Sequence, residues 1–375
     1  MNICYLDNAA TTFPKPVAVR REMDRCMATY CGNPGRGSHR MALYASEAVY
    51  EARRKAVELF CAEDEEHVVL TMNATHALNL AIRGLIKKGD HVLISDLEHN
   101  STLRPVMYLC AKGDVEYSIF KTKGDICENV KALIRKNTRA VICTHVSNIT
   151  NICLPIEELG RMLYSMGILF IVDASQSAGS HKIDMRASRI SALCTAGHKG
   201  LLGPQGTGLL MLSGEVKPEP LIYGGSGSDS RSPLMPESLP DRLEGGTLFT
   251  PGAAGLSQGM DYVLRVGEEN IRKKESALIE KIRAHYENDV RIREYSEGEG
   301  AIWLFNIKGV SSQKTAQMLD SYGVCVRPGL HCAPLAHMTL GTPADGAVRV
   351  SAGPLTTDAD ADRFIYALDR VLSKI

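Results

Sequence analysis

A regular alternation between two kinds of segment constrains this chain more than any other feature. Between about residues 15 and 250, short apolar runs that end in polar or glycine residues are separated by amphipathic stretches with helical spacing. Strands and helices that alternate in this way build an α/β domain with a mainly parallel sheet. We predict seven strands, at 67–71, 91–95, 115–120, 140–145, 169–173, 192–196 and 208–212. Helices are expected between them at 46–61, 76–87, 128–136 and 155–165.

The remainder of the chain follows a different pattern. Residues 221–252 are rich in Gly, Ser and Pro and have no periodicity, which predicts a long irregular segment, and loops of that length are usually functional. Beyond it we predict a smaller α+β domain. Its elements are a long helix at about 253–289, strands near 302–307, 323–327 and 347–351, and a final helix from Asp358.

Two domains follow from these patterns. The large domain is expected to span residues 15–252. The small domain is expected to combine residues 1–14 with 253–375 and to include a Gly- and Pro-rich loop at about 326–346.

Charge and cysteine usage limit the partners and the compartment. Lys plus Arg equals Asp plus Glu at 43 each, so no overall field favours nucleic acid or an anionic membrane. Apolar runs such as 168–172 are far shorter than the ~20 residues that span a bilayer, and the first residues lack a signal pattern. The 11 scattered cysteines form neither a disulfide framework nor a zinc motif. We expect a cytoplasmic protein without nucleic-acid or membrane partners.

Polar residues follow the predicted strands, where ligands bind in open α/β sheets. Ala74 and Thr75 begin a helix whose N-terminus suits a phosphate, although they also make a good helix start without one. His99 follows the second strand and can stack or transfer a proton, or simply donate structural hydrogen bonds. Asn148 and Asp173 follow the fourth and fifth predicted strands, and a carboxylate at a buried strand end needs a positive partner.

Lys199 is presented between glycines after the sixth strand. A lysine in a partly desolvated pocket has a lowered pKa and can form a Schiff base. Pyridoxal phosphate requires such a lysine for its aldehyde, an acid for its pyridinium nitrogen and donors for its phosphate. Lys199, Asp173 and the helix start at Ala74 meet these needs together, so we predict this cofactor.

A second cluster surrounds Cys332. His331 and Arg327 are close in sequence and could favour a thiolate, and we expect the loop to be exposed and flexible. A structural thiol is the plain alternative. A metal site formed with His331 and His337 is the other alternative, although it lacks a fourth ligand and regular spacing.

Arg349 lies in the middle of a predicted strand between apolar neighbours. A buried guanidinium is costly without an anion, and its fork of donors suits a substrate carboxylate. A structural salt bridge would satisfy the same side chain equally well.

Taken together, these segments resemble the class V aminotransferase family nearly end to end. Within it, the chain is similar to the cysteine desulfurase and selenocysteine lyase group that carries an Arg-x-Gly-x-His-Cys-Ala loop. The shared motifs are YLDNAATT at 5–12, GNPGRGSH at 32–39, EH at 98–99, HVSN at 145–148, DASQ at 173–176, GHKGLLGPQG at 197–206, EGGT at 244–247, RPGLHCA at 327–333 and RVS at 349–351.

The resemblance implies the type I fold of pyridoxal-phosphate-dependent transferases and assigns roles around the cofactor. Lys199 would carry the cofactor and act as a catalytic residue, and Asp173 would pair with the pyridine nitrogen. Gln176 would donate to the phenolic oxygen. His99 would stack on the ring and take part in catalysis, and Asn148 would line the site.

The resemblance also assigns the phosphate site. Ala74, Thr75 and His198 would bind the phosphate, and Thr247 would reach it from the second subunit of a homodimer.

The reaction implied is the conversion of L-cysteine to L-alanine, with a persulfide left on Cys332. Arg349, helped by Asn148, would hold the substrate carboxylate. A sulfur-acceptor protein would receive the sulfur for iron–sulfur cluster or thio-cofactor assembly. Two alternatives stay open, namely a selenocysteine lyase or another pyridoxal-phosphate enzyme of this family, and a cofactor-binding assembly protein with little turnover.

Four positions depart from the pattern common in the family. Ala196 replaces a Ser or Thr phosphate ligand, although Thr195 is adjacent. His76 replaces a Glu, and Phe249 and Thr356 each replace an Asn. We expect these changes to alter cofactor affinity or loop contacts rather than the chemistry, with phosphate affinity affected most.

Overall fold

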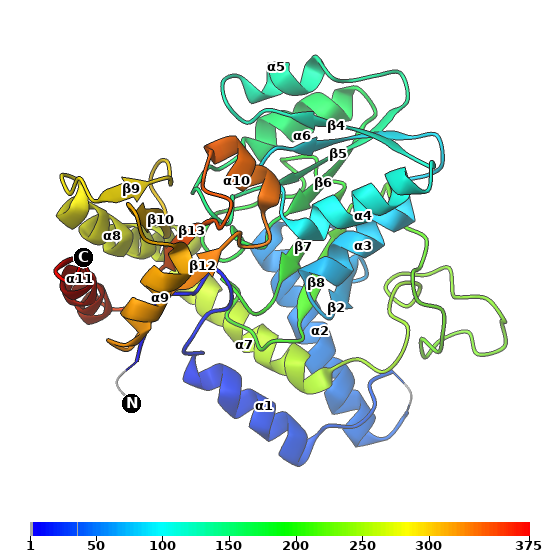
Figure 1. The fold of residues 1–375 in the computed structure, drawn as a ribbon. Coiled ribbons are helices and arrows are strands. Elements are labelled where there is room, and N and C mark those ends of the chain that lie inside the picture. The colour runs from blue at the N-terminus through cyan, green and yellow to red at the C-terminus, as the bar shows by residue number, and fades with distance from the viewer. Residues whose placement is uncertain (1–2, 36) are drawn as a thin grey trace.

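The computed structural model describes residues 3–35 and 37–375, so Arg36 of the 32–39 motif lies outside the described residues. Its centre is a seven-stranded sheet with the order β2-β8-β7-β6-β5-β3-β4 (Figure 1). Only β8 runs against the others, which confirms the mainly parallel α/β architecture. The strands are β2 (Val68–Thr71), β3 (His91–Ser95), β4 (Glu116–Phe120), β5 (Thr138–Thr144), β6 (Leu169–Asp173), β7 (Ala192–Ala196) and β8 (Gly208–Leu212).

Helices cover both faces of this sheet, which explains why its inner strands are buried along most of their length. In β5, Val141 and Cys143 face a core shared with α2, α6 and α7, whereas Ala140 and Ile142 face a core shared with α3 and α4. The helices of this part are α1 (Val17–Thr29), α2 (Arg40–Phe60), α3 (Ala74–Leu85), α4 (Asn100–Ala111), α5 (Ile126–Lys131), α6 (Ile156–Ser165) and α7 (Thr250–Val266).

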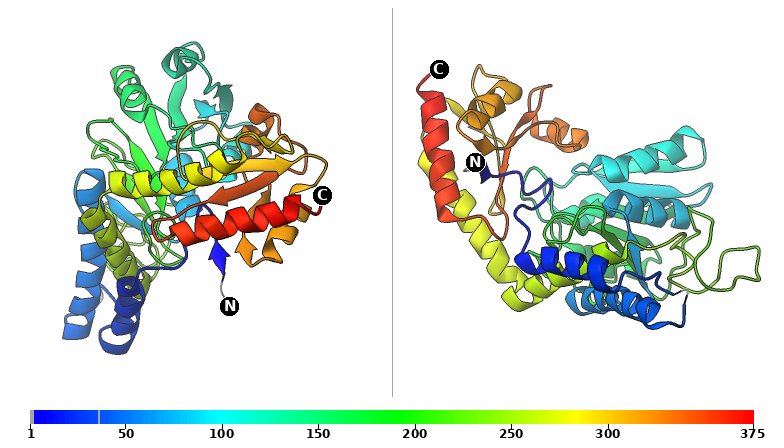
Figure 2. Two further views of the ribbon diagram at one scale, coloured as in Figure 1. Left: turned by 90° about the vertical axis from the view of Figure 1, so that its left-hand side faces the viewer. Right: turned by 90° about the horizontal axis from the view of Figure 1, so that it is seen from below.

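A second, antiparallel sheet has the order β12-β13-β10-β9 and carries its own core. Trp303 and Phe305 stack within that core against residues of α8 and α11, which lie side by side (Figure 2). A short parallel pair, β1 with β11, joins the start of the chain to this part. The elements are β1 (Cys4–Tyr5), α8 (Glu268–Tyr286), β9 (Ile292–Glu294), β10 (Ile302–Ile307), α9 (Ser312–Asp320), β11 (Val324–Cys325), β12 (Arg327–Gly329), α10 (Pro334–Leu340), β13 (Ala347–Ser351) and α11 (Asp358–Leu372).

Several predicted elements end differently in the structure. The single helix expected at 253–289 is wrong, because Gly267 has a φ of 84° and separates α7 from α8. Such a left-handed conformation suits glycine and ends a helix. The strand expected at 323–327 is two strands, β11 and β12, and the helix expected at 128–136 already ends at Lys131.

Two irregular segments were predicted, and only the first is irregular in the structure. No helix or strand occurs at 221–249, which confirms the first, and Figure 1 shows it projecting beyond the helices. The stretch 326–346 is not one loop, since it contains β12 and α10. The proposed boundary at residue 252 falls inside α7, and the division into domains remains a prediction. No helix among the described residues is long and apolar enough to cross a membrane.

Candidate active site

The carboxyl ends of the parallel strands meet at one edge of the large sheet, as the strand directions require. The residues that follow them include Thr75 after β2, His99 after β3, Asn148 after β5, Asp173 at the end of β6 and Lys199 after β7. Burial lowers the pKa values of both His99 and Lys199, the Asp173 carboxylate opposes the shift in each, and the Lys199 charge lowers the pKa of His99 further. The structure therefore places the side chains of His99, Asp173 and Lys199 close enough to influence one another's protonation.

Lys199 lies directly beyond β7 and stays partly exposed. Burial of its ammonium group lowers its pKa to about 8, and the Asp173 carboxylate opposes this shift. The turn that carries it is packed closely, because a Cβ on Gly200 would lie 2.2 Å from the carbonyl oxygen of Ala178. Lys199 is thus an amine that loses its proton near neutral pH, as a Schiff-base lysine must.

Asp173 is buried and only one of its carboxylate oxygens is engaged. Its Oδ1 accepts hydrogen bonds from the Ser175 backbone N–H at 2.9 Å and from the Ser175 hydroxyl at 2.5 Å. Its Oδ2 forms no hydrogen bond within the described part of the chain. A buried carboxylate with a free oxygen suits a protonated ring nitrogen.

The start of α3 offers unused donors. Asn73 caps the helix by accepting from the His76 N–H at 2.9 Å, and the helix itself leaves the N–H groups of Ala74 and Thr75 without acceptors. His198 has a buried Nδ1 that lacks a partner among the described residues. These groups, together with the helix dipole, form a donor set suited to a phosphate.

His99 is connected to this donor set by hydroxyl groups. Its Nδ1 lies 2.9 Å from the Ser101 hydroxyl, which in turn lies 2.8 Å from the Thr75 hydroxyl. The same Nδ1 accepts from the Ser101 backbone N–H at 3.0 Å, so the neutral ring carries its hydrogen on Nε2. Burial and the charge of Lys199 lower the pKa of His99 to about 4, which keeps the ring neutral at pH 7.

Two predicted residues, Gln176 and Asn148, make contacts that the sequence did not indicate. The Gln176 side chain donates to the Ala9 carbonyl at 2.9 Å, and the Asn148 side chain donates to the His331 carbonyl at 2.9 Å. Each amide keeps a second N–H for a ligand. Thr247 is exposed and lines a surface pocket that includes Met72 and His76 on either side of the α3 N-terminus but not Lys199.

Arg349 lies in β13 with only 1% of its surface exposed. Its Nη2 forms an ion pair with Asp7 Oδ1 at 2.9 Å and its Nη1 donates to the Asn148 carbonyl at 3.1 Å, while its buried Nε has no partner in the described residues. The salt-bridge alternative is therefore present. Asp7 had been noted only as part of the YLDNAATT motif, because 342 residues separate the partners.

Cys332 occupies the short turn between β12 and α10 and is exposed. Its Sγ lies 3.9 Å from Nη2 of Arg327, and its carbonyl accepts from the Asn100 N–H at 2.7 Å. This hydrogen bond ties the turn to the start of α4, next to His99. The expectation that His331 favours a thiolate is wrong, because both ring nitrogens of His331 are engaged elsewhere and burial lowers its pKa to about 2.

The departures from the family pattern lie around the site rather than within it. Ala196 is buried at the end of β7, and the Thr356 hydroxyl accepts from the Gly353 N–H at 2.8 Å. His76 has a buried Nε2 without a partner in the described part, and Phe249 is half exposed. No group of three metal-ligating side chains occurs in residues 3–35 and 37–375.

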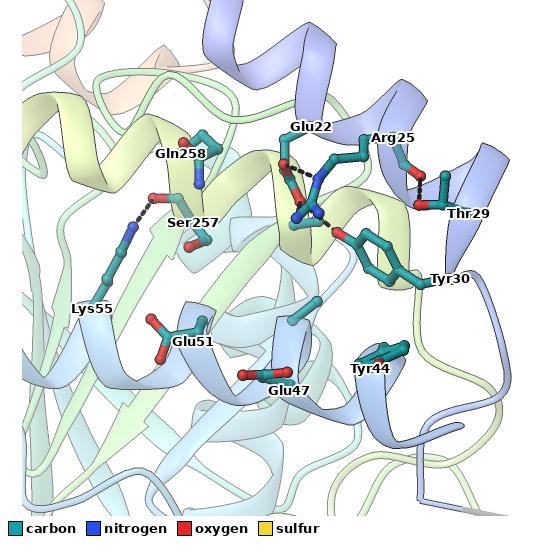
Figure 3. Close-up of a pocket in the computed structure, with 12 residues that line it drawn as sticks. Glu22, Arg25, Thr29, Tyr30, Tyr44, Glu47, Glu51, Lys55, Ser257 and Gln258 are labelled. Carbon is teal, nitrogen blue, oxygen red and sulfur yellow. Dashed lines mark hydrogen bonds and ion pairs between the residues drawn. The ribbon is translucent and has the colours of Figure 1, made fainter. Parts of the chain in front are cut away.

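A separate pocket of about 500 Å³ lies between α1, α2 and α7 (Figure 3). Its polar groups satisfy one another, since Glu22 pairs with Arg25 at 2.8 Å and accepts from Tyr30, and Lys55 donates to the Ser257 carbonyl at 3.3 Å. The pocket contains none of the predicted site residues.

The family model for class-V aminotransferases matches residues 4–364. The chain belongs to the class-V aminotransferase family. Two relatives named probable cysteine desulfurase share this family's sequence features. The one from Methanothermobacter thermautotrophicus is 34% identical over 92% of this chain and 89% of its own length. The one from Pyrococcus abyssi is 31% identical over 100% of this chain and 95% of its own length.

A solved class-V structure agrees with the fold. The apo structure of a cysteine desulfurase from Thermococcus onnurineus NA1 superposes with a TM-score of 0.92 at 28% identity, covering 100% of this chain and 95% of that one. Members of this family depend on pyridoxal phosphate. The residues here fit that cofactor, because the site combines a lysine of lowered pKa, a half-engaged buried carboxylate and unused phosphate donors.

Proposed function

We propose that this class-V aminotransferase is a cysteine desulfurase that converts L-cysteine to L-alanine and retains the sulfur as a persulfide on Cys332. The single observation that carries the proposal is the placement of this exposed thiol. Cys332 lies 3.9 Å from the Arg327 guanidinium, on a turn whose backbone is hydrogen-bonded to Asn100 beside His99. A thiol next to a cation at the edge of a lysine site suits attack on a substrate sulfur.

The residues around the cofactor would bind its phosphate, its aldehyde and its ring nitrogen. Bound pyridoxal phosphate supplies an electron sink for the substrate Cα, and its phosphate would be held by Ala74, Thr75 and His198. Lys199 would bind the cofactor aldehyde and then, as a neutral amine, take the proton from the substrate Cα. Asp173 would keep the ring nitrogen protonated.

Further residues would orient the cofactor and the substrate. His99 is neutral and would lie against the cofactor ring, and the free N–H of Gln176 would reach its phenolic oxygen. Arg349 uses two of its five N–H groups on Asp7 and Asn148, which leaves donors for the substrate carboxylate.

Sulfur transfer would then occur at Cys332. Its thiolate attacks the substrate sulfur, so the S–S bond of the persulfide forms as the C–S bond of cysteine breaks. The electron pair of that bond stays on carbon, and protonation there yields alanine. Because Cys332 is exposed, an acceptor protein could collect the sulfur without entry into the site.

Two features support a homodimer as part of the proposal. Thr247 is exposed and is not among the residues that line a pocket with Lys199, so it is available to a partner subunit, as the family resemblance implies. Large apolar side chains on the same irregular segment, 221–249, are also exposed, including Phe249 at 50%, Tyr223 at 72% and Leu234 at 77%. All 11 cysteines are free thiols, which supports a cytoplasmic location.

The test is alanine release from L-cysteine by the protein loaded with pyridoxal phosphate, in the presence of a thiol reductant. We expect one sulfide for each alanine, and loss of turnover in Cys332→Ser but not in Cys31→Ser, which removes another exposed thiol. Absence of alanine from the loaded protein would refute the proposal. Alanine from selenocysteine alone would make the protein a selenocysteine lyase instead.

A further inference from the structure

Two histidines beside the reactive turn form a continuous hydrogen-bonded chain. The Thr342 hydroxyl lies 2.8 Å from His337 Nδ1, and His337 Nε2 lies 3.1 Å from His331 Nδ1. His331 Nε2 then lies 3.0 Å from the carbonyl oxygen of Arg327. Both histidines are 3% exposed, and their rings meet edge to edge, with centroids 5.4 Å apart and planes inclined by 18°.

The Arg327 carbonyl fixes the direction of the two hydrogen bonds that the His331 ring makes. A carbonyl oxygen only accepts, so His331 must carry its hydrogen on Nε2 and accept on Nδ1. His337 must therefore donate from Nε2. The Thr342 hydroxyl lies 2.8 Å from His337 Nδ1 and 3.3 Å from the His337 carbonyl oxygen, so it has two possible acceptors. Burial lowers the pKa of His337 to about 4, so at neutral pH its Nδ1 carries no proton and accepts from the Thr342 hydroxyl. A proton added to His331 would point two N–H groups at each other, so His331 is neutral and has one defined tautomer.

The hydrogen bonds that link Thr342, His337, His331 and the Arg327 carbonyl connect the two sides of the Cys332 turn. Arg327 belongs to β12 before the turn, and His337 belongs to α10 after it. His331 and Cys332 have φ values of 51° and 56°, a left-handed conformation that costs free energy in residues with a Cβ. Two such residues in succession persist only where the surroundings hold them. The histidine chain supplies this support from the buried side, opposite the exposed thiol.

We propose that His337, oriented by Thr342, is a positioning residue that acts through His331 to keep Cys332 in its reactive conformation. The proposal rests on the proposed function, in which Cys332 accepts the sulfur. Neither His337 nor Thr342 has a role in the family resemblance given above. His331 holds the turn and is not an acid or base for the thiol.

Matched substitutions separate this role from simple packing. Thr342→Val removes the hydroxyl and keeps the shape, whereas Thr342→Ser keeps the hydroxyl. His337→Leu removes the donor to His331, whereas His337→Gln keeps an N–H at a similar reach. Met338→Gln, at a side chain that is 77% exposed on the same helix, is the control.

The measurements are the rate at which iodoacetamide alkylates Cys332, read by mass spectrometry without substrate, and single-turnover alanine formation by the loaded enzyme. In His337→Leu the buried Nδ1 of His331 loses its donor, and the free energy of that lost hydrogen bond should lower the turnover rate by roughly tenfold. The rate of Cys332 alkylation should change as well, while KM for cysteine and the absorbance of the bound cofactor stay unchanged. Thr342→Val should show a smaller loss, and Thr342→Ser and His337→Gln should recover most of each loss.

Equal rates in His337→Leu and in the parent enzyme would overturn the proposal, as would equal losses in His337→Leu and His337→Gln. If His337→Leu fails to bind the cofactor, the comparison of Thr342→Val with Thr342→Ser decides, and identical behaviour of those two overturns the proposal. The proposed function fails separately, since it requires Cys332→Ser to lose turnover whatever the histidine variants do.

Discussion

Replacement of Asp7 by asparagine tests how the buried Arg349 is made ready for a substrate. Asp7 is the only carboxylate that pairs with Arg349 in the described part of the chain, at 2.9 Å. The guanidinium is 1% exposed and its pKa is lowered by burial, so the pairing offsets an unfavourable environment. We expect Asp7→Asn to leave the folded site intact and to weaken the binding of a substrate carboxylate, because the Arg349 guanidinium loses the carboxylate that orients it.

The magnitude follows from the degree of burial. Removal of one partner from a fully buried ion pair costs about 3–5 kcal/mol of folding free energy. Here the Asp7 side chain is 22% exposed, and asparagine retains a hydrogen-bond acceptor, so both effects reduce that loss and the site should still fold. We expect the less firmly oriented guanidinium to bind the substrate carboxylate about 1.4 kcal/mol more weakly, which corresponds to a roughly tenfold increase in KM for L-cysteine.

The assay is steady-state alanine formation over a range of L-cysteine concentrations. Asp24→Asn, at an exposed acid on α1, is the control for loss of one negative charge. The Asp7 charge also raises the pKa of Lys199, so the pH midpoint of Lys199 should fall in the variant. An unchanged KM would refute the reasoning, and a decreased KM would show that Asp7 competes with the substrate rather than orients Arg349.

Three further predictions concern other parts of the chain. Glu244→Leu breaks the buried ion pair with Arg53 at 2.7 Å, so the free energy of unfolding measured in urea should fall by about 3 kcal/mol. The double variant with Arg53→Met should recover much of this loss, and additive losses in the double variant would contradict the reasoning. Uptake of pyridoxal phosphate by the apoprotein should rise with pH and level off above about 8, because capture needs the neutral amine of Lys199; a midpoint near 10.5 would contradict the lowered pKa. Partial burial raises the thiol pKa of Cys153, so iodoacetamide should alkylate it more slowly than Cys332 at pH 7.5, and equal rates in mass spectrometry would count against that reasoning.

The large sheet could be predicted from the sequence because most of its strands are buried on both faces. Four strands, at 91–95, 169–173, 192–196 and 208–212, have the predicted bounds. Continuous apolar runs that end in polar residues mark such strands clearly. The polar residues after them also predicted which side chains meet at the edge of the sheet, since parallel strands place their carboxyl ends together.

Other features depend on contacts between distant segments. The break at Gly267 was missed because an amphipathic pattern continues through α7 and α8, and only the positive φ separates them. The pairing of Arg349 with Asp7 requires the β1 segment to lie beside β13, which no local pattern indicates. His331 and His337 could be found as neighbours in the sequence, but their tautomers follow only from the Arg327 carbonyl at one end of the chain.

The most direct test of the central claim is to locate the sulfur after one turnover. The protein loaded with pyridoxal phosphate would be mixed with one equivalent of L-cysteine without reductant, alkylated, digested and examined by mass spectrometry. The account predicts one extra sulfur atom on the Cys332 peptide, with an equal amount of alanine, and neither product in Cys332→Ser. Alanine with the extra sulfur on a different cysteine, or on none, would contradict the account.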